Sequence, residues 1–252
     1  MSKIKLLTIL IPTFNSAKFL PACLRSIEKQ CFKNFQIFCV DGGSKDRTLK
    51  IIKNSKFNIK IISKKDKSFE DGVNKSFRYI KTNFFMIIGS DDFLGGPNYI
   101  KNLYNIIKNN KYHIVFSQYG EVLNKRKKII LQSNDFSCLN YKTVVPGLGW
   151  IGTKEILKSA KYSCKLKVAN DYDFFLKLYK KKFNFFRTNK SVYYFRLGAN
   201  SFRNALLGYY EQKTIGLRNN GSKLRIYFTY YFLITKFLTK FVILNLFFNI
   251  RN

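Results

Sequence analysis

Short apolar runs alternate with segments of helical periodicity along the N-terminal part of the chain. Four runs predict strands buried on both faces: Leu6–Ile11, Phe35–Val40, Phe57–Ile62 and Phe84–Ile88. The segments between them predict three helices: one with Ser16 as N-cap, one beginning near Thr48 and one over Phe69–Ile80. A β-α unit repeated three times predicts a Rossmann-like α/β fold, with a mostly parallel mixed sheet covered by helices on both faces.

The rest of the chain continues this pattern less regularly. Ile114–Phe116 predicts a strand, and Glu121–Leu131 predicts a hairpin whose basic turn, residues 125–128, is exposed. That turn fits solvated side chains, and it could equally face an anionic lipid surface. A further helix is expected from Asp171, and Ser191–Arg196 predicts a strand.

The C-terminal segment Ile226–Ile250 is apolar and long enough to span a membrane, but it contains Lys236 and Lys240. Each lysine would cost about 2.5 to 3.5 kcal/mol near the centre of a bilayer. Thr229 and the two lysines share a narrow face of the helix, and apolar residues fill most of the remainder. This predicts an amphipathic helix in the membrane interface. Packing on the preceding domain is the alternative.

Charge is the most unusual feature of the composition. The 252 residues include 46 Lys and Arg against 14 Asp and Glu, a formal net charge of +32. Such an excess predicts an anionic partner: a nucleic acid, an acidic membrane surface or a phosphorylated substrate. A general lysine bias spread over solvated faces would explain it as well. The sequence has no nucleic-acid-binding motif, so we expect no nucleic acid among the partners.

The cysteines predict no disulfide framework. Their number is odd, and no C-x-x-C pair occurs among Cys23, Cys31, Cys39, Cys138 and Cys164. No signal peptide precedes the Leu6–Ile11 strand, so we expect a cytoplasmic protein with reduced thiols. A catalytic pair of one cysteine with His113, the single histidine, has no supporting motif.

Two adjacent carboxylates, Asp91 and Asp92, follow the apolar run Phe84–Ile88. In an open α/β sheet, ligands bind at the carboxyl ends of the strands. Hard oxygen ligands at that place suit Mg²⁺ or Mn²⁺ and a phosphate-bearing substrate. The alternative is that the pair caps a helix that starts near Pro97.

The second strand also ends in a carboxylate, Asp41, followed by Gly42 and Gly43. The glycines allow a sharp turn, and the carboxylate could accept hydrogen bonds from a nucleobase or a ribose. An ordinary turn with Asp46 as helix cap is the alternative. The sequence has no G-x-G-x-x-G after the first strand and no P-loop, so a dinucleotide fold is not expected.

Glycines surround Trp150, the single tryptophan, at positions 147, 149 and 152. Glycines let the backbone approach a ligand, and an aromatic face suits stacking on a sugar ring. The alternative is that Trp150 belongs to the core.

Five stretches carry most of these features: Ile9–Asn15, Val40–Thr48, Ser63–Lys75, Gly89–Asp92 and Asn170–Leu178. In this order they resemble the inverting nucleotide-sugar glycosyltransferases of family 2, which have the GT-A fold. Gly89–Asp92 stands where the family has its D-x-D metal motif. Asn170–Leu178 matches its E-D-x-D/E-x-x-L-x-L motif, with Asn170 in place of the usual Glu. The resemblance covers roughly residues 4–200 and implies a GT-A fold.

The resemblance also implies a nucleotide-sugar site. The residues expected to line or adjoin it are Pro12, Thr13, Asn15, Asp41, Asp66 and Asp91. Among them, Asp41 would hold uracil or another base, and Asp91 would contact the sugar or the ribose. Asp92 would be the direct ligand of Mg²⁺ or Mn²⁺, which would neutralise the departing diphosphate.

On the acceptor side, the resemblance implies that Asp171 deprotonates the attacking hydroxyl as general base. The alternative is an N-cap carboxylate. We also place Gly149, Trp150 and Asp173 on this side.

The sequence therefore predicts an inverting, metal-dependent sugar transferase, with a GT-A catalytic domain over residues 1–202 and a C-terminal helical region over 203–252. The expected donor is a UDP-sugar, and the expected acceptor is a polyprenyl-diphosphate-linked glycan of bacterial O-antigen, capsule or lipooligosaccharide synthesis. We expect a peripheral protein on the inner face of the bacterial cell membrane. The alternatives are transfer to polyprenyl phosphate itself, and a non-catalytic basic protein that binds anions or membrane surfaces.

Overall fold

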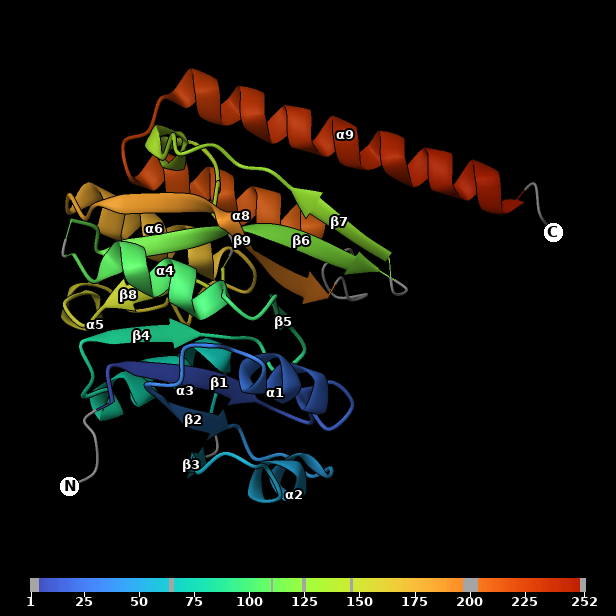
Figure 1. Ribbon diagram of the computed structural model, residues 1–252. Helices are drawn as coiled ribbons and strands as arrows, with labels where there is room; N and C mark the ends of the chain where they lie inside the picture. The colour runs from blue at the N-terminus through green and yellow to red at the C-terminus, as the bar shows by residue number, and fades with distance from the viewer. Residues whose placement is uncertain are drawn as a thin grey trace.

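The computed structural model describes residues 5–63, 66–109, 111–123, 126–145, 147–196 and 204–249. Within them lies a sheet formed by β1 (Leu7–Thr13), β2 (Phe35–Asp41), β3 (Ile59–Ser63), β4 (Phe84–Ile87), β5 (Phe93–Gly95), β6 (Ile114–Leu123), β7 (Arg126–Ile130), β8 (Ile151–Thr153) and β9 (Phe185–Arg196). The helices described are α1 (Leu20–Glu28), α2 (Thr48–Lys53), α3 (Phe69–Ser76), α4 (Tyr99–Ile107), α5 (Ile156–Ser159), α6 (Asn170–Lys180), α8 (Ala205–Arg218) and α9 (Lys223–Asn249). Figure 1 shows their arrangement.

The sheet is mixed but mostly parallel, as predicted. Strands β3, β2, β1 and β4 run parallel in that order, with Thr13 opposite Asp41. Strand β8 is antiparallel and separates β4 from β6, which pairs in parallel with β9. The short strands β5 and β7 are antiparallel to β9 and β6. The carboxyl ends of β1, β2 and β4 therefore lie at the same edge, where the aspartates were expected.

Helices cover both faces because the strands bury side chains on both sides. Helices α1, α2 and α4 pack on one face, together with Ile9 and Ile11 of β1. Helices α3, α6 and α8 pack on the other face, together with Leu10. The predicted alternation of buried strands and covering helices is confirmed.

Several element boundaries differ from the prediction: α3 ends at Ser76, β3 spans Ile59–Ser63 and β6 continues to Leu123. The largest differences are in α1 and β9. Helix α1 begins at Leu20 rather than next to Ser16, because the Ser16 carbonyl accepts the N–H groups of Phe19 and Leu20 in a preceding turn, at 3.1 and 3.0 Å. Strand β9 begins at Phe185, well before Ser191, because residues 185–188 pair with β6 and the polar Arg187 and Thr188 are buried there. A polar run that is buried by pairing has no periodic signal in the sequence.

The β6–β7 hairpin is present as predicted, with Arg126, Lys127 and Lys128 exposed on β7. Lys125 of its turn and the side chain of Lys240 lie outside the described residues.

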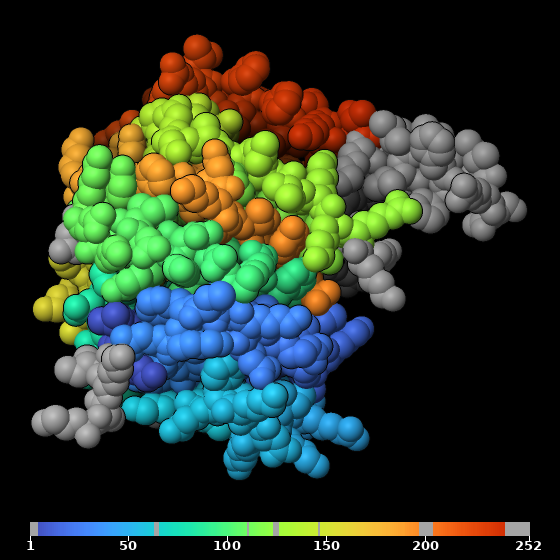
Figure 2. All heavy atoms as spheres, viewed as in Figure 1, coloured from blue at the N-terminus to red at the C-terminus, as the bar shows by residue number. Residues whose placement is uncertain are grey.

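The C-terminal segment forms two helices, of which α9 lies at the end of the molecule opposite β1, β2 and β3 (Figures 1 and 2). Helix α9 packs on α8 through the buried side chain of Ile226 and the rings of Tyr209 and Phe237, whose centroids are 6.4 Å apart. Among the residues that the structure describes, no helix combines the length and apolar character needed to cross a membrane.

Candidate active site

Two cavities meet at the carboxyl edge of the sheet. The strand-end cavity, about 580 Å³, lies at the ends of β1, β2 and β4 and reaches the start of α3. The helix-side cavity, about 400 Å³, lies between β9, residues 143–145 and 147–148, and the first turn of α6. Asp91 and Leu148 line both cavities, so a ligand in one can reach a ligand in the other at this junction.

The strand-end cavity brings together five of the residues predicted for the nucleotide site: Pro12, Thr13, Asn15, Asp66 and Asp91. The backbone of Asn15 is left-handed, with φ of 47°, and its Oδ1 accepts the N–H of Lys45 at 2.9 Å. Phe14 also lines this cavity, and its side chain is 65% exposed. Phe14 was not among the predicted site residues, although a large aromatic side chain next to a strand end can indicate a ligand site.

Asp41 does not line the strand-end cavity. It is 0% exposed, and its carboxylate accepts the N–H groups of Gly43 and Ser44 at 3.0 and 2.9 Å. The hydroxyls of Ser44 and Thr13 also donate to it, at 2.6 and 3.0 Å. Direct contact with a base is therefore not supported. The carboxylate instead fixes the turn after β2, where Gly43 has φ of 93°, a conformation that favours glycine.

The two carboxylates after β4 have different surroundings. Asp92 is 6% exposed; its Oδ2 accepts the Tyr193 hydroxyl at 2.7 Å and its Oδ1 accepts the N–H of Arg196 at 3.1 Å. Burial, reinforced by the charge of Asp91, raises the pKa of Asp92 to about 7. Asp91 is exposed at the junction of the cavities, and no hydrogen bond to its carboxylate occurs within the described ranges. Neither caps α4, which begins at Tyr99 after Asn98.

This difference bears on which aspartate could hold a divalent cation. Each oxygen of Asp92 already accepts one protein donor, which leaves Asp92 less free than Asp91 for a cation, and its predicted role as the direct ligand stays a prediction. The free carboxylate of Asp91 fits a cation that shares its remaining coordination with substrate phosphates and water, as Mg²⁺ sites commonly do. No cluster of three or more His, Cys, Asp or Glu ligands is found in the described part of the chain, so a substrate would have to supply further oxygens.

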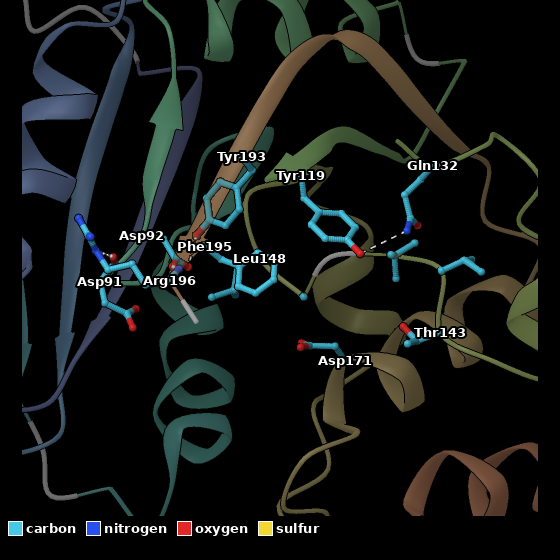
Figure 3. A pocket seen from close by; sticks show the side chains of 13 residues that line it. Asp91, Asp92, Tyr119, Gln132, Thr143, Leu148, Asp171, Tyr193, Phe195 and Arg196 are labelled. Atoms are coloured by element: carbon cyan, nitrogen blue, oxygen red, sulfur yellow. Dashed lines mark hydrogen bonds between the residues drawn. The ribbon is translucent and has the colours of Figure 1, made fainter. Parts of the chain in front are cut away.

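Asp171 lies in the first turn of α6 and faces the helix-side cavity. Figure 3 shows its carboxylate below the ring of Tyr119, apart from that of Asp91, which lies at the edge of the view beside Asp92. A Cβ at residue 147 would overlap the Asp171 carboxylate, so glycine at this position leaves the carboxylate its place. Burial, reinforced by the charge of Glu70, raises the pKa of Asp171 to about 7. The N-cap of α6 is Ala169, so Asp171 is not the capping residue.

The structure does not place the other three predicted acceptor-side residues in either cavity. Trp150 is fully buried against Phe85 and Phe175, so its ring has no free face for a sugar and the core alternative holds. Gly149 has a structural role: its carbonyl accepts the Tyr99 hydroxyl, and its φ of 82° favours glycine. Asp173 is buried in ion pairs with α6 and α8 side chains.

Several residues of the site had no sequence signal. Tyr193 and Arg196 come from β9, more than a hundred positions after Asp92, and meet it only through the β5–β9 pairing. Tyr119 and Gln132 line the far side of the helix-side cavity and are hydrogen-bonded to each other at 3.4 Å (Figure 3). Their types and spacing alone indicate no shared site.

The mostly parallel sheet with two joined cavities at its carboxyl edge is the architecture of the GT-A fold. The sequence model of glycosyl transferase family 2 matches residues 8–187, and the chain belongs to this family.

Two relatives have curated names. A PGL/p-HBAD biosynthesis glycosyltransferase of Mycobacterium bovis is 36% identical over 91 residues, which are 34% of this chain and 36% of the relative. The match thus spans about a third of that protein's length. A dolichyl N-acetyl-α-D-glucosaminyl phosphate 3-β-D-2,3-diacetamido-2,3-dideoxy-β-D-glucuronosyltransferase of Methanococcus voltae is 26% identical over 243 residues, 84% of this chain and 74% of the relative.

Two solved structures share the fold at low sequence identity. TarS 1-349 of S. aureus, in complex with UDP-GlcNAc, has a TM-score of 0.67 and 18% identity, over 92% of this chain and 71% of that one. The mannosyltransferase PcManGT of Pyrobaculum calidifontis, in complex with GDP-Man and Mn²⁺, has a TM-score of 0.67 and 12% identity, over 89% and 67%.

Proposed function

We propose that the chain transfers a sugar, with inversion, from a UDP-sugar to a hydroxyl group of an acceptor glycan. The observation that carries this proposal is the pair of carboxylates, Asp91 and Asp171, that line one cavity continuing into the strand-end cavity and accept no hydrogen bond from the described residues. A donor diphosphate beside Asp91 and an acceptor hydroxyl beside Asp171 would meet at the junction near Leu148.

The strand-end cavity is the proposed donor site. The exposed ring of Phe14 would stack on the base, and Thr13 and Asn15 would border the nucleoside. Asp91 would hold Mg²⁺ or Mn²⁺ together with the donor diphosphate. A bound divalent ion supplies positive charge that neutralises the leaving diphosphate. The UDP-GlcNAc and the GDP-Man with Mn²⁺ in the two related structures support a nucleotide-sugar donor and a divalent metal.

The helix-side cavity is the proposed acceptor site. Asp171 would take the proton of the acceptor hydroxyl, whose oxygen forms a bond to the anomeric carbon while the bond from that carbon to the diphosphate oxygen breaks. Attack from the side opposite the leaving group inverts the anomeric configuration. A carboxylate with its pKa near 7 is a stronger base than an ordinary one, and at neutral pH a large fraction of it remains ionised.

A donor panel tests the proposal. We expect UDP release from at least one of UDP-N-acetylglucosamine, UDP-glucose and UDP-galactose in the presence of Mn²⁺ and a synthetic polyprenyl-diphosphate sugar. Release that requires bare polyprenyl phosphate in place of the sugar acceptor would favour the alternative acceptor. Release from GDP-mannose alone would overturn the uridine assignment.

Turnover should depend on pH through Asp171. Burial raises the pKa of this group to about 7, so below that pH the carboxyl is protonated and can no longer accept a proton. We expect kcat to fall as the pH decreases through about 7, approaching about tenfold for each further unit. The measurement is kcat between pH 5 and 9 at saturating donor. A rate that stays constant between pH 5 and 8 would contradict a base with this pKa.

A lipid-linked acceptor on an anionic membrane surface is the second part of the proposal. Large exposed hydrophobic side chains recur at helical spacing along α9, at Leu224, Tyr227, Phe228, Tyr231, Phe232 and Leu238. Lys223, Arg225 and Lys236 lie beside this stripe and are exposed. An apolar stripe bordered by cations is typical of a helix that lies in the headgroup region of an anionic bilayer. The Methanococcus voltae relative, named for a dolichyl-linked substrate, supports such an acceptor.

Vesicle binding tests this part. We expect sedimentation with phosphatidylglycerol vesicles and much weaker sedimentation with phosphatidylcholine vesicles. Burial of one aromatic side chain is worth about 1.5 to 3 kcal/mol, so Phe228→Ser with Phe232→Ser should weaken binding by about tenfold or more. Ile61→Ser is the control, because this exposed side chain lies on β3 at the opposite end of the molecule. Equal binding by the wild type, the double variant and Ile61→Ser would show that α9 does not contact the membrane.

A further inference from the structure

Glu211 of α8 is a buried carboxylate outside both cavities. Its side chain is 8% exposed. Oε1 accepts the N–H of Lys167 at 2.9 Å, and Oε2 accepts the N–H groups of Val168 and Ala169, each at 2.9 Å. Three backbone donors thus converge on one carboxylate from a helix that begins some forty residues later in the chain.

These three donors belong to the segment that leads directly into α6. The N-cap of α6 is Ala169, whose side chain cannot accept a hydrogen bond. The amino end of a helix leaves backbone N–H groups without partners and carries partial positive charge. Of the three donors, the N–H of Ala169 belongs to this amino end, and those of Lys167 and Val168 lie just before it. Glu211 thus accepts one donor of the helix end and fixes the two residues that precede the helix. Asp171 follows two residues later, so this contact fixes the entry of the chain into the turn that carries Asp171.

Two further contacts of α8 reach the same region. Arg218 donates to Oδ1 of Asp173 at 2.8 Å, which holds α6 from the opposite end of α8. Gln212 accepts the N–H of Thr143 at 3.3 Å, and Thr143 lines the helix-side cavity. Helix α8 thus contacts two walls of that cavity, although it lies beyond residues 8–187, the part that matches the family.

We propose that Glu211 is a positioning residue for Asp171, and that α8 is part of the catalytic unit rather than of a separate C-terminal region beginning at residue 203. Glu211 touches no substrate and acts through the segment 167–169. It holds the Asp171 carboxylate in its buried place, near Glu70 of α3 and the buried hydroxyl of Tyr162. The role of Asp171 as base rests on the proposed function, whereas its position does not.

The test is the titration of Asp171 itself, followed by carbon-13 NMR of protein labelled at aspartate carboxyl groups. The signal is assigned by its loss in Asp171→Asn. Glu211→Gln keeps the size of the side chain but replaces one accepting oxygen with an NH₂ group, which cannot accept the backbone N–H groups. Thr214→Ala is the matched control, an exposed position on the same helix. UDP release from the best donor of the panel and calorimetric UDP affinity are measured on the same proteins.

We expect a titration midpoint near 7 in the wild type and in Thr214→Ala. In Glu211→Gln it should move toward the ordinary carboxyl value by about one unit or more, because the group leaves its buried place. UDP release should fall by about tenfold or more with UDP affinity unchanged, because α8 does not line the strand-end cavity. A merely structural role would lower the folded fraction and leave the midpoint of the folded protein in place.

An unmoved midpoint in folded Glu211→Gln overturns the proposal, as does an equal shift in Thr214→Ala. If Glu211→Gln does not fold, Arg218→Gln is measured by the same criteria, since the Arg218 side chain is 61% exposed and its removal is milder. Undiminished turnover by Asp171→Asn would refute Asp171 as the base. The NMR midpoint would still decide whether Glu211 positions its carboxylate, so the two failures are distinguishable.

Discussion

Replacement of Asp171 by asparagine is expected to lower the rate of sugar transfer by a factor of about 10² to 10⁴, the usual contribution of a general base. Asparagine has nearly the same shape but cannot take a proton from the acceptor hydroxyl. UDP affinity should be unchanged, because Asp171 lines only the helix-side cavity. The measurement is kcat for UDP release with acceptor present, together with calorimetric UDP titration of the same variant.

Thermal unfolding provides the control for this variant. Because the pKa of Asp171 is raised to about 7, the folded protein binds this proton more tightly than the unfolded chain does. The stability associated with the group is therefore full below about pH 4 and is lost as the pH rises through about 7. Asparagine has no charge to bury, so the variant should be at least as stable as the wild type at pH 8. A transfer rate within threefold of the wild-type rate would remove Asp171 from its proposed role.

Asp91→Asn is expected to cause the second large loss. Asp91 is the exposed carboxylate at the junction of the cavities and carries no protein hydrogen bond within the described residues. Its replacement should abolish the response of turnover to Mn²⁺ and lower kcat/KM by about 10² or more, since metal stabilisation of transition-state charge is worth several kcal/mol. The measurement is the rate of UDP release as a function of Mn²⁺ concentration.

Asp92→Asn is the matched comparison. Its oxygens are occupied by Tyr193 and Arg196, so this variant should still respond to Mn²⁺, although loss of these contacts would lower the rate. The opposite pattern, with the response kept in Asp91→Asn and lost in Asp92→Asn, would restore Asp92 as the direct ligand.

Both Asp92 and Asp171 are carboxylates whose pKa values are raised mainly by burial. Keeping ionised carboxylates in such places costs stability, and sites that do so are commonly functional. The two groups differ in their surroundings: Asp92 has two protein donors, whereas Asp171 lines the helix-side cavity near Glu70 and accepts no hydrogen bond from the described residues. The first arrangement fixes the loop after β4, and the second leaves a base free to meet an acceptor.

The repeated β-α pattern was sufficient to predict the parallel core of the sheet, because buried strands and their covering helices have strong periodic signals. The positions of Asp91 and Asp171 followed from motifs at strand and helix ends. The hydrogen bonds and burial of each carboxylate did not follow, because they depend on residues distant in the sequence. Tyr193 of β9 donates to Asp92, and Glu211 of α8 accepts N–H groups from the segment before α6. A sequence pattern indicates the position of a side chain along a helix or strand. It does not indicate which other residues form hydrogen bonds with that side chain.

The same dependence on tertiary contacts explains why the surroundings of Trp150 and Asp41 differ from those predicted. Glycines beside an aromatic residue are compatible with a sugar site or with tight core packing, and here Phe85 and Phe175 surround the indole. A carboxylate at a strand end can face a ligand or its own turn, and the donors of Ser44 and Thr13 retain Asp41 within the turn. Only the tertiary contacts decide between these alternatives.

Calorimetric titration of UDP into the wild type and Asp91→Asn, with and without Mn²⁺, tests most directly whether the strand-end cavity is a metal-assisted nucleotide site. We predict that Mn²⁺ strengthens UDP binding to the wild type by about tenfold or more, and that this gain disappears in Asp91→Asn. A parallel titration of GDP should show weaker binding. Wild-type protein that binds UDP no better with Mn²⁺ than without it, or that does not bind UDP at all, would contradict the proposed donor site.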